Sequence, residues 1–425
     1  MYENLRGKKL LVIGSEELDA CIVRTAQSLG VYVIAVDGKP KSASTFAKNE
    51  ANESWDMDYS DTEAVSRRCL EAGVDGVIAG YSEHRVLAAC KIANAIGTPF
   101  YATQQQIDLT RNKRLFKDEC AKYGVLVPRD YCFNDAPTEE QMAAMEYPVI
   151  VKPTDYAGRK GITVCYDRET LDMAVPYAMK LSGSHTIIVE DYITGIEFSA
   201  VYSLSDGEIS LSCFNEKYLN EQQTRKSGLC DLALTPSALL DDYLQQADGS
   251  VKDFLRGIGA RDGVAFFQGI ADGQRFWIFE MGYRLNGGND YFLVEQCNGI
   301  SYMKMLISHA LTGSMGDDLS KDNPHLTTYH SNFPLYAHAG TVATVAYTGE
   351  EDYPGVHEVH INKVPGDRIV EDGSTGQRAF SFKLSADSLD ELARLINYVQ
   401  SHVVLTDAEG NNLMFAPFDT GRLRR

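Results

Sequence analysis

The chain has 425 residues, of which 44% are hydrophobic and 23% are charged, which is the composition of a globular protein of two or three domains. Its net charge of -19 disfavours nucleic acid or an anionic membrane as a partner, because phosphate groups attract clustered Lys and Arg. The nine cysteines include no Cys-x-x-Cys pair, and the first apolar run is only Leu10–Ile13, so we expect reduced, mostly buried thiols in a cytoplasmic protein without a signal peptide or membrane span.

Residues 8–101 alternate strand-like and helix-like segments. Apolar runs at 10–13, 31–36 and 76–78 are predicted strands, and amphipathic stretches at 18–29, 64–70 and 86–96 are predicted helices. This order predicts a parallel sheet in a doubly wound unit. Only Gly14-Ser-Glu-Glu17 follows the first strand, so a Gly-x-Gly-x-x-Gly fingerprint is absent and we expect no dinucleotide here.

A helical segment through 111–117 leads to a short β-branched run that ends in Lys152 and Pro153. A basic loop, Gly158-Arg159-Lys160-Gly161, and a second strand follow. Lysines and a glycine-rich turn can neutralise a polyphosphate, because glycine lets backbone N–H groups approach the oxygens. An ordinary exposed hairpin is the alternative. We also expect residues 156–161 to be poorly ordered without nucleotide, since little apolar material anchors them.

Two oxygen-bearing side chains follow later in strand-like runs, Gln268 after residues 264–267 and Glu280 at the end of 276–280. The turn signal between them predicts neighbouring antiparallel strands. A two-residue turn at Asp272-Gly273 would put the two side chains on opposite faces, whereas a three- or five-residue loop puts them on one face. We predict the odd-length loop, and with it a shared Mg²⁺; a solvated Glu280 and Arg284 are the alternative.

From about residue 331 the sequence is β-rich up to Phe382 and then helical from Ser388 to His402. With these segments in order, the chain resembles the ATP-grasp superfamily of carboxylate–amine and related ligases over nearly its whole length. The resemblance implies an α/β (α+β) fold in three parts: a Rossmann-like subdomain at 1–105, an ATP-grasp nucleotide-binding and catalytic domain at 106–330, and a β-rich C-terminal subdomain at 331–425.

Carried over residue by residue, the resemblance implies an ATP site with Mg²⁺ or Mn²⁺. The residues that would bind the nucleotide phosphates are Lys113, Lys152, Gly158, Arg159, Lys160 and Gly161, with Lys160 the main loop contact. Adenine would be held by Glu190, Asp191 and Ile193, and the ribose by Glu197. The metal ligands would be Gln268 and Glu280, and the catalytic arginine Arg284. Exposed lysine on a helix is the alternative for Lys113. Gly282 stands where the family commonly has Asn, which puts a second metal in question.

The implied reaction is ATP-dependent activation of a small carboxylate, an amino acid being one option, as an acyl phosphate that an amine then attacks. A homodimer is a further expectation from the family. Two alternatives remain open: a catalytically silent ATP-binding regulatory module, and a bicarbonate-activating activity similar to carbamoyl phosphate synthase. A biotin carboxylase is disfavoured, because Arg284 runs into Leu-Asn-Gly-Gly288. Lys217, Arg225 or Lys226 could grip a substrate carboxylate, although solvated loop charges are the commoner case, and Tyr283 and Asn286 flank the reactive position.

Overall fold

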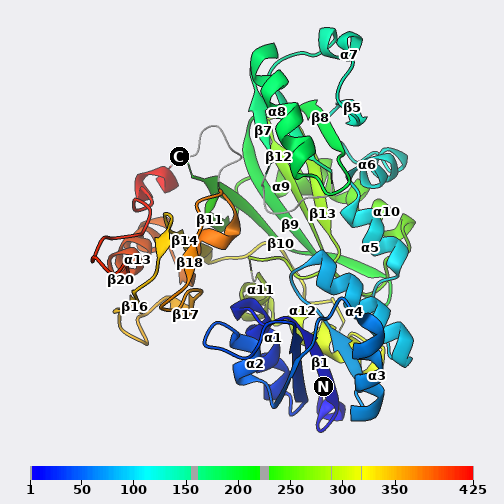
Figure 1. The fold of residues 1–425 in the computed structure, drawn as a ribbon, viewed down its shortest axis with the longest axis vertical. Helices are drawn as coiled ribbons and strands as arrows, with labels where there is room; N and C mark the ends of the chain where they lie inside the picture. Colours follow the sequence, from blue (N-terminus) through cyan, green and yellow to red (C-terminus); the bar gives the residue numbers. More distant parts are fainter. Residues whose placement is uncertain (1, 155–160, 221–228, 289, 317, 425) are drawn as a thin grey trace.

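The computed structural model describes residues 2–154, 161–220, 229–288, 290–316 and 318–424 (Figure 1). The first unit is the predicted parallel sheet, in the order β3-β2-β1-β4 with helices around it. Two of its helices end where the next residue is a left-handed glycine, Gly73 after α3 and Gly97 after α4. The elements of this unit are η1 Glu3–Leu5, β1 Lys9–Ile13, α1 Glu17–Ser28, β2 Tyr32–Asp37, α2 Phe46–Glu50, β3 Glu53–Asp56, α3 Thr62–Ala72, β4 Gly76–Ile78 and α4 Glu83–Ile96.

Two helices then connect to a small antiparallel sheet with the order β5-β8-β6-β7. Helix α5 begins with a capping box between Thr103 and Gln106, and the Asn112 side chain caps α6. Figure 1 shows this sheet at one end of the molecule and the first unit at the other. The elements are α5 Gln104–Arg111, α6 Lys113–Lys122, β5 Asp130–Asn134, α7 Glu139–Ala143, β6 Val149–Pro153, β7 Thr163–Cys165, α8 Arg168–Leu181 and β8 Ile187–Asp191.

A large antiparallel sheet of eight strands lies between these ends, in the order β13-β12-β9-β10-β11-β14-β19-β17. It is continuous across residue 330, because β11 pairs with β14. The C-terminal strands therefore extend the sheet that carries the predicted metal ligands. Its strands are β9 Ile196–Ser205, β10 Glu208–Leu219, β11 Cys230–Thr235, β12 Gly263–Ala271, β13 Phe276–Gly282, β14 Tyr329–Tyr336, β17 Val356–Ile361 and β19 Arg378–Ala386.

The two faces of the large sheet differ. One face packs aromatic side chains against α9 and α10, with Phe198, Phe214 and Tyr243 in mutual contact. The other face is covered in part by the buried helix α12, which also contacts β4 of the first unit. The remaining elements are α9 Leu240–Gln246, α10 Asp248–Gly257, α11 Asp290–Asn298, α12 Tyr302–Thr312, β15 Gly340–Thr341, β16 Thr344–Tyr347, β18 Arg368–Ile369, η3 Thr375–Gln377, α13 Leu389–Ser401, β20 Val403–Thr406 and η4 Thr420–Arg424.

All nine cysteines are free and seven of them are buried, as the sequence predicts. None of the helices in the described ranges is both long enough and apolar enough to cross a membrane.

Candidate nucleotide and metal site

The predicted metal ligands Gln268 and Glu280 lie directly opposite each other on β12 and β13. The loop that joins these strands is not the odd-length loop we predicted. Ala271 pairs with Phe276, which leaves the four residues 272–275 between them. An even loop would send the two side chains to opposite faces, so another feature must correct the register.

That feature is a β-bulge in β13. Gly269 pairs with Ile278 while Gln268 pairs with Glu280, so Phe279 is an extra residue on its strand. Gly269 is required here, because a Cβ at this position would lie 2.4 Å from the carbonyl oxygen of Trp277. The predicted outcome, two oxygen donors on one face, is therefore correct, but the predicted cause is wrong.

The same pairing continues across the next two strands. Ser199 on β9 pairs with Gln268, and Asn215 on β10 pairs with Ser199. Paired residues point to one face of a sheet, so Glu280, Gln268, Ser199 and Asn215 form one polar row. In the described part of the chain, neither Gln268 nor Glu280 has a hydrogen-bonding protein partner, and the Ser199 hydroxyl and the Asn215 amide oxygen are buried without one.

This donor set fits a magnesium ion. A carboxylate and an amide oxygen, half-buried on one face, are ligands that Mg²⁺ accepts while it keeps several waters or substrate phosphates. Gly282 adds nothing to the set for a steric reason: it pairs with Phe266, and a Cβ at 282 would lie 2.4 Å from the Phe266 ring. The aromatic ring thus takes the space that a third ligand would need.

Arg284 follows β13 and is held by a carboxylate of the first unit. Its Nε donates to Oε1 of Glu83 on α4 at 2.7 Å, and its guanidinium lies 5.0 Å from the centre of the Phe266 ring. Burial alone would raise the pKa of Glu83, but the charge of Arg284 outweighs it and the pKa is lowered. The pair fixes the arginine at the boundary between the first unit and the large sheet.

The two site residues predicted on the small sheet, Lys152 and Glu190, are in direct contact. Glu190 on β8 pairs with Ile150 on β6, so Lys152 lies on the same face, and its ammonium forms an ion pair with the Glu190 carboxylate. Both side chains are buried. Lys152 also lies 5.4 Å from the Phe279 ring, which is the bulged residue next to Glu280. The strand that supplies the lysine is thereby close to the predicted metal ligand.

Lys117 completes this cluster, and sequence reasoning missed it. Its ammonium lies 2.5 Å from Glu190 Oε2, binds Asp130, and donates to the Pro128 carbonyl at 2.9 Å. Burial would raise the pKa of Glu190, but Lys152 and Lys117 together hold it below its usual value; burial would lower the pKa of Lys117, but Glu190 and Asp130 raise it. The available signal was its spacing, one helical turn after Lys113.

The remaining predicted nucleotide-binding residues that the structure describes lie on α6, on β8 and the loop after it, and on β9. Lys113 is the half-buried first residue of α6, Asp191 accepts a hydrogen bond from Arg129 at 3.3 Å, and Ile193 is half-buried in the loop after β8. Glu197 is buried and lies 3.7 Å from Lys217 on the neighbouring strand.

Gly161 has a positive φ of 81°, and a Cβ there would lie 2.8 Å from Pro153. Gly158, Arg159 and Lys160 lie outside the described residues, as do the candidates Arg225 and Lys226. The expected disorder of 156–161 falls on the same segment, of which only Gly161 is described.

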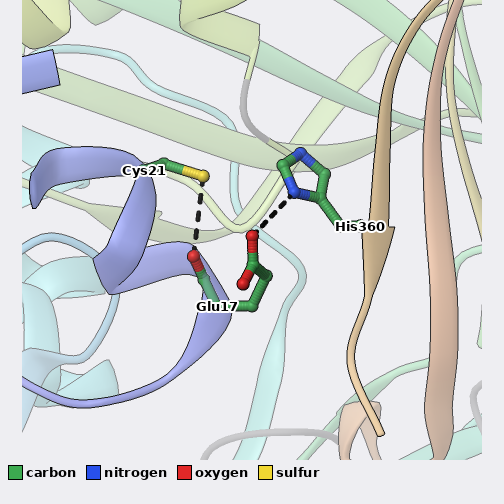
Figure 2. Close-up of side chains that lie close together, drawn as sticks. All are labelled: Glu17, Cys21 and His360. Atoms are coloured by element: carbon green, nitrogen blue, oxygen red, sulfur yellow. Dashed lines mark hydrogen bonds and ion pairs between the residues drawn. The ribbon is translucent and has the colours of Figure 1, made fainter. Parts of the chain in front are cut away.

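A second ionic cluster joins the first unit to the C-terminal strands (Figure 2). His360 on β17 binds Glu17 of α1 through Nδ1 at 3.1 Å and Glu358 through Nε2 at 2.9 Å. Its pKa, which burial would lower, is raised by these two carboxylates. Cys21 lies beside Glu17, and ligand atoms of Glu17, Cys21 and His360 are all within 4.8 Å of one another.

This cluster already contains its own cations. Arg24 donates to Glu17 at 2.7 Å and to Cys21 Sγ at 3.3 Å, and burial raises the pKa of the Cys21 thiol to about 11. A metal would have to displace the guanidinium and two protons. We therefore interpret the cluster as an ionic contact between two parts of the protein, which sequence reasoning did not anticipate because its members are more than 300 residues apart.

With this geometry in place, comparison with known proteins gives a consistent result. Residues 110–284 match the ATP-grasp domain family. The carbamoyl phosphate synthase large chain of Clostridium acetobutylicum is 23% identical over 365 residues, which cover 81% of this chain and 33% of that protein. A formate-dependent phosphoribosylglycinamide formyltransferase of Prochlorococcus marinus is 27% identical over 268 residues, covering 61% of this chain and 66% of that one.

Among solved structures, an L-amino acid ligase from Bacillus licheniformis superimposes with a TM-score of 0.78 over 95% of this chain and 99% of that one, at 18% identity. At this identity the likeness concerns the fold, which is the predicted Rossmann-like unit followed by the ATP-grasp sheets. The chain spans about a third of the length of the Clostridium synthase.

Proposed function

We propose that the protein is an ATP-dependent ligase that joins a small carboxylate to an amine and releases ADP and phosphate, because residues 110–284 match the ATP-grasp domain family. The observation that carries the proposal is the polar row on the large sheet. It places the two metal-ligand candidates, Gln268 and Glu280, on one face with unsatisfied polar groups on the two strands next to them. Arg284 stands beside the row.

In this proposal Gln268 and Glu280 hold Mg²⁺, which would neutralise charge on the nucleotide phosphates. Lys113, Lys152 and the glycine-flanked loop that ends at Gly161 bind the phosphates. Glu190, Asp191 and Ile193 contact adenine, and Glu197 binds the ribose hydroxyls. Lys152 has to exchange Glu190 for a phosphate when the nucleotide binds. Lys117 makes this exchange possible, because it stays with Glu190 and keeps that buried carboxylate paired.

The reaction needs alignment and charge stabilisation rather than a nucleophilic side chain. A substrate carboxylate oxygen attacks the γ-phosphorus, an O–P bond forms, the bond to the β,γ-bridging oxygen breaks, and ADP leaves. The amine nitrogen then attacks the acyl carbon, loses a proton, and displaces phosphate as the C–O bond breaks. Arg284 is suited to the charge that develops on the transferred group, since its planar guanidinium offers several donors in fixed geometry.

The test is ADP release with Mg²⁺ and separate pools of amino acids, other small carboxylates, amines and bicarbonate. We expect release that requires one carboxylate-containing pool together with an amine. Release with bicarbonate alone would support the carbamoyl-phosphate-synthase-like alternative instead.

A second candidate function is a nucleotide-binding regulatory module without turnover. Its specific support is the Phe266 ring, which excludes a ligand from position 282. ATP binding with no ADP release from any pool would favour this candidate and contradict the ligase.

A further inference from the structure

Lys383 is a buried cation that forms no ion pair with any carboxylate in the described part of the chain. It stands on β19 with 6% of its surface exposed, and its ammonium donates to the carbonyl of Gly288 and to Oδ1 of Asn332 at 3.1 Å. Among the described residues, none of the carboxylates lies within ion-pair distance of it. Burial lowers the pKa of Lys383 to about 8, although Asp290 and Glu358 act in the opposite direction. A buried ammonium with only neutral acceptors is costly unless an anion joins it.

A small pocket opens beside this lysine. Asp290, His330, Asn332, His357 and Lys383 supply its polar lining, and Phe292 supplies an apolar wall. Burial lowers the pKa of His330 to about 4 and also lowers the pKa of His357, so both imidazoles are neutral at pH 7. The charges of the lining are therefore one ammonium and one carboxylate, those of Lys383 and Asp290.

Asp290 is the second charged group of the pocket and is held from two sides. It is the first residue of α11, is 5% exposed, and its Oδ2 accepts hydrogen bonds from the amides of Asn215, at 3.4 Å, and Asn286. The amide oxygens of both asparagines are buried without a partner. Asn286 lies two residues after Arg284, and Asn215 ends the polar row that begins at Glu280. The carboxylate is thereby tied to both parts of the proposed reaction site.

Strand register places Lys383 on the same face of the sheet as that row. Lys217, two residues after Asn215 on β10, pairs with Ala233 on β11, which pairs with Asn332 on β14, which pairs with Lys383 on β19. Asn215 itself is three strands from Glu280, or about 14 Å at the usual strand spacing. Lys383 stands three strands beyond β10, and Asp290 joins its pocket to the row because Asp290 accepts a hydrogen bond from Asn215.

We infer that this pocket recognises the acceptor or donor substrate as an amino acid, with the substrate carboxylate bound by Lys383 and the substrate ammonium bound by Asp290. The inference rests on the proposed function, of which it names the substrate class. In the described part of the chain neither Lys383 nor Asp290 has a direct ion-pair partner, so a ligand that carries both an ammonium and a carboxylate can pair with both. Lys383 was not a candidate at the sequence level, because nothing in its strand distinguishes it from a solvated lysine.

The test measures the binding of the standard amino acids, acetate and methylammonium to the full chain loaded with ADP and Mg²⁺. Thermal shift and calorimetry are the two readouts. The variants are Lys383→Met, Lys383→Arg and Asp290→Asn. Lys252→Met is the matched control, since Lys252 is also partly buried but is paired with Asp248 at 2.8 Å on α10, away from the pocket. Retained ADP binding and an unchanged circular dichroism spectrum show that each variant is folded.

We expect at least one amino acid to stabilise the wild type and the control more than acetate or methylammonium does. Its affinity should fall about tenfold or more, or about 1.4 kcal/mol, in Lys383→Met and in Asp290→Asn, with partial recovery in Lys383→Arg. The inference is overturned if none of the amino acids binds. It is also overturned if binding persists in Lys383→Met and in Asp290→Asn, which would mean that Lys383 serves only to hydrogen-bond the Gly288 carbonyl. Amino acid binding without any ADP release would instead refute the ligase reaction and leave the pocket intact.

Discussion

Two buried lysines mark the two ends of the proposed reaction surface, and their surroundings differ. Lys117, at the nucleotide end, lies between Glu190 and Asp130 and has its charge fully compensated by protein groups. Lys383, at the other end, donates among the described residues to the oxygens of Gly288 and Asn332 and to no carboxylate. The proposed nucleotide end therefore pairs its buried lysine with protein carboxylates, whereas in the described part of the chain Lys383 forms no ion pair with a carboxylate. The difference indicates which end is completed by a substrate.

The first prediction tests whether the reaction takes place at the polar row. Glu280→Ala should lower ADP release by about 100- to 1000-fold, because the phosphates lose an oriented countercharge. The assay is initial-rate ADP release at saturating ATP. Glu208→Ala, at an exposed position of β10, is the control and should leave the rate unchanged. Full activity in Glu280→Ala would show that the polar row does not take part in the reaction.

A second variant asks whether Lys152 truly changes partners at the nucleotide end. Lys152→Met should weaken ATP binding by about ten- to hundredfold, since a hydrogen bond to a charged phosphate contributes about 1.5–3 kcal/mol. AMP, which lacks the β- and γ-phosphates, should bind nearly as well as to the wild type. Calorimetry with both nucleotides measures the split, and an equal loss for AMP and ATP would show that Lys152 serves the fold rather than the phosphates.

Lys117 should behave in the opposite way, as a stabilising group. Lys117→Met leaves Asp130 unpaired and Glu190 with one lysine, and we expect unfolding in urea to require about 1–3 kcal/mol less free energy. The control is Lys122→Met on the same helix, whose side chain is 61% exposed and should have almost no effect. If Lys117→Met has the same free energy of unfolding as the wild type, the ion pairs of Lys117 with Asp130 and Glu190 do not stabilise the fold.

The smallest effect is expected at the contact between the first unit and β17. The pKa of His360 is raised in the folded protein, so its charge stabilises the fold fully below its ordinary value of about 6.5, and this stabilisation is lost as pH rises through the higher folded value. The groups that face it are Glu17, Arg24 and Cys21 from α1, with Glu358 and Lys383 from the sheet.

The free energy of unfolding, measured against His360→Gln at each pH, should show a difference of about 1 kcal/mol that disappears at alkaline pH. A difference that grows with pH would contradict the sign. Because Glu358 lies near both His360 and Lys383, this titration also probes the electrostatics of the second end.

The fold was largely predictable from local sequence, and so were the strand positions of several residues of the proposed nucleotide end. Lys152, Glu190 and Glu280 end short apolar runs, and strand ends are positions that a sequence displays directly. The loop length before Glu280 was mispredicted, because a bulge at Phe279 depends on Gly269 of the neighbouring strand and leaves no turn signal. The roles of Lys383 and His360 could not be predicted from the sequence, since they depend on contacts between strands and helices that are far apart in the chain.

The central claim is that one face of the large sheet transfers the γ-phosphoryl group of ATP to a carboxylate. The direct measurement uses a substrate carboxylate labelled with ¹⁸O, drawn from the pool that supports ADP release, and mass spectrometry of the phosphate released. An acyl phosphate transfers one carboxylate oxygen to phosphate, so the account predicts phosphate with a single ¹⁸O in the wild type and almost none formed by Glu280→Ala. Unlabelled phosphate released at the wild-type rate would mean that water, not a carboxylate, attacks ATP, and would contradict the account.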